Sequence, residues 1–167
     1  MVEIKFWIVP VAALIPLIIG FIWYHPKVFG TAWMNASGLT EEKLKGANMG
    51  LVFFLTYIFS CLLASALLSL TIHQLGFQST LMNEEGFGKE GSEVMIYISD
   101  FISKYGNNFR TFKHGALHGT IGGIFLALPI VAVNALFERK SWKYIWINAG
   151  FWILSMMLMG GLVCQFA

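Results

Sequence analysis

Four long apolar stretches, separated by polar segments, dominate the pattern of the chain. They are residues 6–24, 49–72, 114–137 and 142–164. Apart from Lys143 near the start of the last stretch, they contain no Asp, Glu, Lys or Arg. A helix needs ~20 residues to cross a hydrocarbon core of ~30 Å. The pattern therefore predicts an all-α, polytopic membrane protein, with four transmembrane helices in a single domain over residues 1–167.

The first stretch differs from a signal peptide in two respects. Its apolar region is longer than the ~7–15 residues of a signal-peptide core, and no small-x-small cleavage site follows it. We expect it to be retained as a helix. Proline in a helix interior removes a hydrogen bond and clashes with the preceding turn, so we also expect kinks at Pro16 and, in the third helix, at Pro129.

Residues 73–113 form the longest polar segment, which we expect to lie outside the membrane. Within it, apolar side chains recur at helical spacing from Met95 to Tyr105. Ser92 precedes this run as a suitable N-cap, and Gly106 follows it as a stop signal. The pattern predicts a short interfacial amphipathic helix, too polar to span, that lies at the membrane surface or against the bundle.

Aromatic rings gather where the first apolar stretch ends, in the segment FIWYHPKVFGTAWM at residues 21–34. Six positions define this aromatic turn: Trp23, Tyr24, Pro26, Phe29, Gly30 and Trp33. Trp and Tyr collect at the membrane–water boundary, and proline ends a helix. We predict a structural boundary element in which Gly30 permits a close approach of the backbone. The alternative is a groove in which the same rings bind a lipid or a partner helix.

Small residues repeat every four positions in two of the predicted helices. The third helix carries Gly115, Gly119, Gly123 and Ala127, here named the glycine face, and the second carries Cys61, Ser65, Ser69 and His73. Such faces let the backbones of two membrane helices approach closely. We expect both faces to contact other helices, the glycine face either within the chain or in a homo-oligomer.

Composition and charge narrow the class further. Only 12% of the residues are charged, about half the ~25% typical of soluble domains. The net charge of +2 is too small to indicate nucleic-acid binding. Cys61 and Cys164 fall at different depths of the predicted helices, so we expect no disulfide between them.

The distribution of Lys and Arg predicts the orientation. One side carries Lys27, Lys43, Lys45, Arg139, Lys140 and Lys143, and the other carries Lys5, Lys89, Lys104, Arg110 and Lys113. Basic residues in short loops favour the cytoplasmic side, and the very short turn between the third and fourth helices holds three of them. We therefore expect both termini and residues 73–113 to lie outside the cytoplasm.

Three segments carry a resemblance that covers nearly the whole chain: GFIWYHPKVFGTAWM, GLTEEKLKG and ALFERKSWKYIWINAGFWILSMMLMGG. The most specific part is the pattern WY-x-P-x-x-FG-x-x-WM, which is the aromatic turn followed by Met34. The chain resembles a family of small bacterial four-helix integral membrane proteins of unknown function. The resemblance implies a multi-pass protein of the bacterial inner (cytoplasmic) membrane, and it brings no activity, substrate or cofactor.

Three histidines are the candidate metal ligands of the sequence. His73 ends the second predicted helix, and His114 and His118 share a face near the start of the third, on the same side of the membrane. Imidazoles bind Zn²⁺ or Cu, here with Cys164 or Glu84 as a further ligand. The alternative is that the histidines lie at the interface and hydrogen-bond to neighbouring groups or lipid headgroups.

Three functions are compatible with these features. The sequence has no nucleophile–base set, phosphate loop, HExxH or CxxC motif, so we predict neither an enzyme nor a cofactor. Small size and packing faces favour an accessory or scaffold subunit that contacts membrane lipids, as a homo-oligomer or in a larger membrane complex. The alternatives are an oligomeric transporter or channel for small solutes or lipids, which the kinked helices suit, and a metal-binding protein that uses the histidines. We take the accessory subunit as the prediction.

Overall fold

The chain folds into helices in its computed structural model, which describes the backbone of residues 1–167 and every side chain except those of Glu41 and Leu44. The helices are α1 (Ile8–Ala12), α2 (Ile15–Trp23), η1 (Pro26–Gly30), α3 (Thr31–Ser37), α4 (Glu41–Lys45), α5 (Met49–Thr71), α6 (His73–Thr80), α7 (Glu93–Tyr105), α8 (Phe112–Gly122), η2 (Gly123–Ala127), α9 (Leu128–Phe137) and α10 (Trp142–Phe166). Both η segments are short π-helical turns. No strand occurs in the described backbone, which confirms the all-α prediction.

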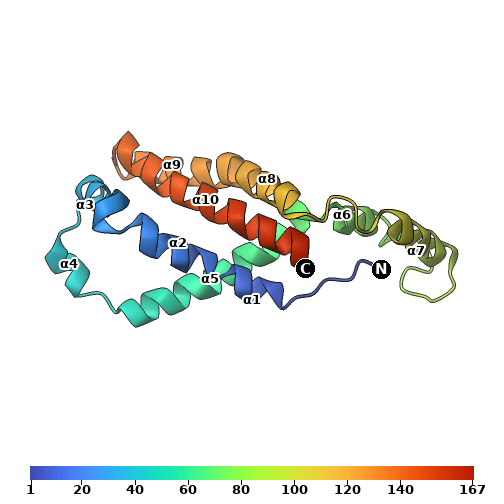
Figure 1. Cartoon of the computed structure of the whole chain (residues 1–167). Helices are drawn as coiled ribbons and strands as arrows, with labels where there is room; N and C mark the ends of the chain where they lie inside the picture. Colours follow the sequence, from blue (N-terminus) through green and yellow to red (C-terminus); the bar gives the residue numbers. More distant parts are fainter.

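Three helices are long and apolar enough to cross a membrane: α5, α10, and the continuous run Phe112–Phe137 formed by α8, η2 and α9. A fourth span is present if Ile8–Trp23 and Pro26–Ser37, which meet at a bend of 58°, count as one. In Figure 1 these helices run along the length of the molecule, and α10 lies between α8–α9 and α2. The structure thus contains three to four candidate spans at the positions of the four predicted stretches.

In two of these candidate spans the regular α-helical geometry changes in the turn that precedes a proline. Pro16 lies in the first turn of α2, and helix α1 ends at Ala12, the residue whose carbonyl the proline ring would meet in a continuous helix. Pro129 follows the π-helical turn η2, which widens the helix where the same conflict would arise. Both interruptions therefore have a local cause in the sequence.

Side-chain caps fix the start of four helices. The side chains of Asn48, Ser92, Thr111 and Ser141 each accept a hydrogen bond from the backbone N–H three residues later. Each cap satisfies one of the N–H groups that a helix start leaves without a partner. The amphipathic helix predicted after Ser92 is confirmed as α7, and Gly106 follows its last residue.

The face of α5 that packs against the bundle differs from the predicted one. The buried side of α5 is formed by Ser60, Ala64, Leu67, Leu68 and Thr71. Ala64, Leu67 and Leu68 belong to the main apolar core, and α5 contacts both α1 and α10. The predicted face, with Ser65, Ser69 and His73, is exposed, and Cys61 is half-buried. The Ser65 hydroxyl donates to the Cys61 carbonyl at 2.9 Å, so it needs no partner on another helix.

Helices α6 and α7 form a hairpin that extends beyond the end of the spans (Figure 1). Its two helices are joined by the stacked rings of Phe77 and Phe101, with centroids 3.7 Å apart. The backbone N–H of Val2 donates to the Gln78 side chain at 2.7 Å, which ties the N-terminal segment to α6. The hairpin, both termini and the end of α10 therefore lie toward one end of the molecule, and α3 and α4 lie at the other (Figure 1).

Candidate functional site

The aromatic turn packs against the start of α10. Trp23 donates through Nε1 to the Ile147 carbonyl at 3.0 Å, and the Tyr24 hydroxyl lies 3.0 Å from the Asn148 side-chain oxygen. The ring of Trp23 contacts Phe29, with centroids 4.5 Å apart, and the ring of Tyr24 contacts Trp33, with centroids 5.2 Å apart. The rings therefore bind one another and α10, and hold the bend between α2 and α3.

The backbone of the aromatic turn follows from Pro26 and Gly30. His25 is extended (ψ 139°), as expected before proline, and its Nδ1 accepts a hydrogen bond from the Lys27 N–H at 3.2 Å. Gly30 is buried, and a Cβ at this position would lie 2.1 Å from the Tyr24 carbonyl oxygen. Only glycine fits this close approach of the backbone.

The glycine face lies against α10. A Cβ on Gly115 would lie 2.1 Å from the Gly160 carbonyl oxygen, and one on Gly119 would lie 2.0 Å from the Met156 carbonyl oxygen. Gly123 faces the Ile153 backbone in the same way, and the partly buried Ala127 packs against the main core. The close contact between α8 and α10 therefore depends on glycine, which has no side chain, at these positions of α8.

Three of the predicted candidate residues meet at the base of the hairpin: His73, His114 and His118, here named the His cluster. One ring nitrogen of each histidine lies within 4.8 Å of the other two. The Nε2 atoms of His73 and His114 are 3.0 Å apart, a hydrogen-bond distance, and the ring centroids of His114 and His118 are 4.5 Å apart. His73 is exposed and the other two are half-buried, so the protein leaves one side of the cluster uncovered.

The two further ligands considered from the sequence do not belong to the His cluster. The Cys164 thiol is buried and lies 3.5 Å from the Thr71 carbonyl oxygen and 3.3 Å from the Phe109 carbonyl oxygen. Glu84 is in the exposed loop beyond α6 and is not one of the grouped ligands. The cluster is therefore built from imidazoles alone in the described part of the chain.

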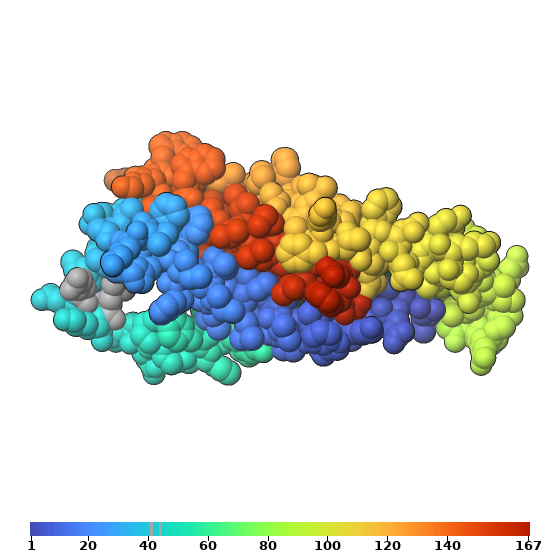
Figure 2. Space-filling model, viewed as in Figure 1, coloured from blue at the N-terminus to red at the C-terminus, as the bar shows by residue number. Residues whose placement is uncertain are grey.

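The loop from α7 to α8 lies next to the His cluster. No feature of the sequence indicated that this loop takes part in the site. Phe109 has a positive φ of 61°, rare for a residue with a side chain, and its ring centroid lies 5.1 Å from that of His114. Arg110 donates from Nε to the Cys164 carbonyl at 3.0 Å, and from Nη2 to the Ala167 carbonyl. Partial burial lowers the pKa of the Arg110 guanidinium. In Figure 2 the end of α10 (red) lies against this region of the chain (yellow).

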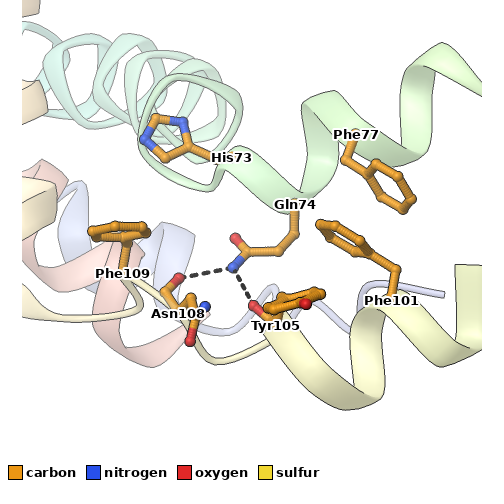
Figure 3. Close-up of a pocket in the computed structure, with 7 residues that line it drawn as sticks. All are labelled: His73, Gln74, Phe77, Phe101, Tyr105, Asn108 and Phe109. Carbon is orange, nitrogen blue, oxygen red and sulfur yellow. Dashed lines mark hydrogen bonds between the residues drawn. The ribbon is translucent and has the colours of Figure 1, made fainter.

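A cavity of about 440 Å³ lies beside the His cluster, inside the base of the hairpin. Its lining is mostly aromatic and is formed by His73, Gln74, Phe77, Phe101, Tyr105, Asn108 and Phe109. Figure 3 shows Gln74 at its centre, where Nε2 donates to the Tyr105 carbonyl at 3.1 Å and to the Asn108 carbonyl at 2.8 Å. These bonds tie α6 to the loop that leads into α8, so both sides of the His cluster are held in place.

Comparison with known proteins identifies the family and no activity. No curated protein and no solved structure matches the chain. The description "Protein of unknown function (DUF1761)" matches residues 7–164, which is nearly the whole chain. The chain therefore belongs to this family of unknown function, and its helices are compatible with a multi-pass membrane protein.

Proposed function

We propose that the chain is a four-span protein of the bacterial inner membrane. In this arrangement Ile8–Trp23 crosses the bilayer, and the 58° bend turns Pro26–Ser37 along the membrane surface. Two features support it: the bend coincides with the aromatic turn, whose Trp and Tyr rings suit the interface, and most of the apolar surface of α5 faces outward, where lipid covers it.

The orientation follows from the basic residues at the α3–α4 end and in the turn before α10, which favour the cytoplasm. We expect Glu3→Cys and Glu85→Cys to react with a membrane-impermeant maleimide in intact spheroplasts, in a background with Cys61 and Cys164 replaced by alanine. Lys43→Cys and Glu138→Cys should react only after the membrane is permeabilised. Labelling of Glu138→Cys together with Glu85→Cys would contradict the single crossing between them.

The function that this geometry supports best is that of a non-enzymatic accessory subunit, which holds the hairpin in a fixed orientation at the membrane surface. The observation that carries the proposal is the outward face of α7. Ile96 is 61% exposed and Tyr97 is 56% exposed, on a hairpin that Gln74 and Gln78 tie to the rest of the chain. Adjoining exposed apolar side chains suit contact with a protein chain or with the membrane. We propose a protein chain as the contact of α7, because the hairpin extends beyond the ends of the spans (Figure 1).

The test is the size of the assembly in mild detergent. We expect the wild-type protein to migrate as one discrete assembly larger than a single chain, and Ile96→Asp to shift it to a smaller size because a charge is placed in the contact. Ser79→Asp adds the same charge to an exposed position of α6, two residues after Phe77 and therefore on the side of α6 turned away from α7, and should leave the assembly intact. Migration of the wild type as a single chain, or equal behaviour of both variants, would exclude the proposal.

A further inference from the structure

The ring nitrogens of the His cluster lie near the separations that one metal ion requires. In a tetrahedral site with Zn–N bonds of ~2.0–2.1 Å, two ligand nitrogens are about 3.3 Å apart. The Nε2 atoms of His73 and His114 are 3.0 Å apart, and the nitrogens of all three rings lie within 4.8 Å of one another. The upper bound of 4.8 Å exceeds the tetrahedral separation by about 1.5 Å, so binding of one ion by all three rings requires a change in side-chain torsions.

Two of the three rings are carried by a rigid part of the bundle. His114 and His118 are one turn apart on α8, so their side chains leave the same face of the helix. The residues that follow them, Gly115 and Gly119, lie in direct contact with the α10 backbone. The backbone that carries both histidines therefore cannot move without breaking the closest helix contact of the protein.

The third ring is held where α5 gives way to α6. Ile72 separates the two helices with an extended backbone (φ −107°, ψ 92°), and its side chain is fully buried. Gln74, on the other side of His73, makes the two hydrogen bonds to the Tyr105 and Asn108 carbonyls. The break directs His73 toward α8, and anchored neighbours on both sides keep it there.

The donor set selects the class of ion. Three neutral imidazoles suit Zn²⁺, Cu²⁺, Ni²⁺ and Co²⁺, whereas Mg²⁺ and Ca²⁺ require oxygen ligands. The cluster contains no carboxylate or thiolate among the described residues. We infer that His73, His114 and His118 bind one divalent transition-metal ion, and Zn²⁺ is the ion to test. Three protein ligands leave a fourth position open, which a water molecule or small anion reaches from the exposed side of His73.

A hydrogen-bonded histidine pair is the competing explanation. It accounts for the 3.0 Å contact of His73 with His114, in which one ring donates and the other accepts. It assigns no role to His118, whose ring lies 4.8 Å from that of His73 and 4.5 Å from that of His114. The two explanations differ in what happens when His118 is removed, so that residue decides between them.

The experiment is a Zn²⁺ titration by calorimetry of the full chain in detergent, purified with a tag that lacks histidine and stripped with a chelator. We expect one Zn²⁺ per chain. His118→Ala should weaken binding by about 100-fold, because even the loss of an outer-shell partner costs on the order of 10- to 100-fold in affinity. His25→Ala, at the opposite end of the molecule, removes one imidazole and should bind Zn²⁺ as the wild type does.

A second measurement distinguishes loss of metal binding from loss of folding in the variants. Thermal unfolding of each variant without metal shows whether it folds, and Zn²⁺ should raise the unfolding temperature of the wild type and of His25→Ala but not of His118→Ala. Co²⁺ should give the visible absorption of a low-coordinate site in the wild type and in His25→Ala alone. If His118→Ala does not fold, His118→Gln takes its place. Equal Zn²⁺ affinity of the wild type and the His118 variant, or no saturable binding by the wild type, would overturn the inference.

Discussion

Replacing Gly119 by leucine is expected to lower the free energy of unfolding by about 1–3 kcal/mol or more. A Cβ at this position would already lie 2.0 Å from the Met156 carbonyl oxygen and 2.7 Å from its carbonyl carbon, and leucine adds three further carbons. The obstacle is the backbone of α10 and not a flexible side chain, so α8 and α10 must separate. Thermal unfolding in detergent, followed by circular dichroism, measures the loss.

The matched control is a helical glycine in open space. A Cβ on Gly76, in α6, would have no atom within 4 Å, so alanine there meets nothing. We expect Gly76→Ala to be neutral or to stabilise by up to ~1 kcal/mol, since alanine is the better helix former. If Gly119→Leu unfolds at the wild-type temperature, the contact between α8 and α10 is not the close packing described above.

Gly30→Ala is expected to disrupt the aromatic turn, although it adds a single carbon. That carbon would lie 2.1 Å from the Tyr24 carbonyl oxygen and 2.9 Å from the His25 carbonyl carbon, both of them backbone atoms. Relief requires a shift of η1, which removes the Trp23–Phe29 contact. We expect a loss of about 1–3 kcal/mol, as for other overpacked positions, and a lower yield of folded protein. Near-ultraviolet circular dichroism reports the aromatic packing directly.

His25→Ala provides the comparison within the same turn. His25 is exposed, and its one hydrogen bond caps the Lys27 N–H, so its removal should cost less than about 1 kcal/mol. A reversed order, with Gly30→Ala silent and His25→Ala destabilising, would mean that the cap and not the close backbone approach holds the bend.

The apolar pattern was sufficient to predict the candidate spans, because lipid demands long stretches without charge whatever the neighbouring helices are. The start of α7 was also readable, since Ser92 acts on a backbone group three residues away. The packing face of α5 was not readable. Small polar residues at Ser65 and Ser69 suggested a helix contact, but a hydroxyl can also bond to its own helix, as Ser65 does.

Only part of the His cluster could be predicted from the sequence. Helical spacing places His114 and His118 together, but the approach of His73 depends on the break at Ile72 and on the loop that carries Phe109. The positive φ of Phe109 has no signature in the sequence, because residues other than glycine and asparagine seldom adopt it. Contacts set by such a loop require the folded structure.

The central place of α10 also bears on the order of events during synthesis. More than half of its apolar window is buried, compared with about a fifth for α5, and it touches α1, α2, α5, α8 and α9. It is also the last of these helices to leave the ribosome. The earlier helices are therefore synthesised before the surface of α10 that unites them, and until then the glycines of α8 lack the α10 backbone against which they pack. A nascent chain that stalls before α10 would leave these contact surfaces uncovered, so the packing of the earlier helices is completed only when α10 is present.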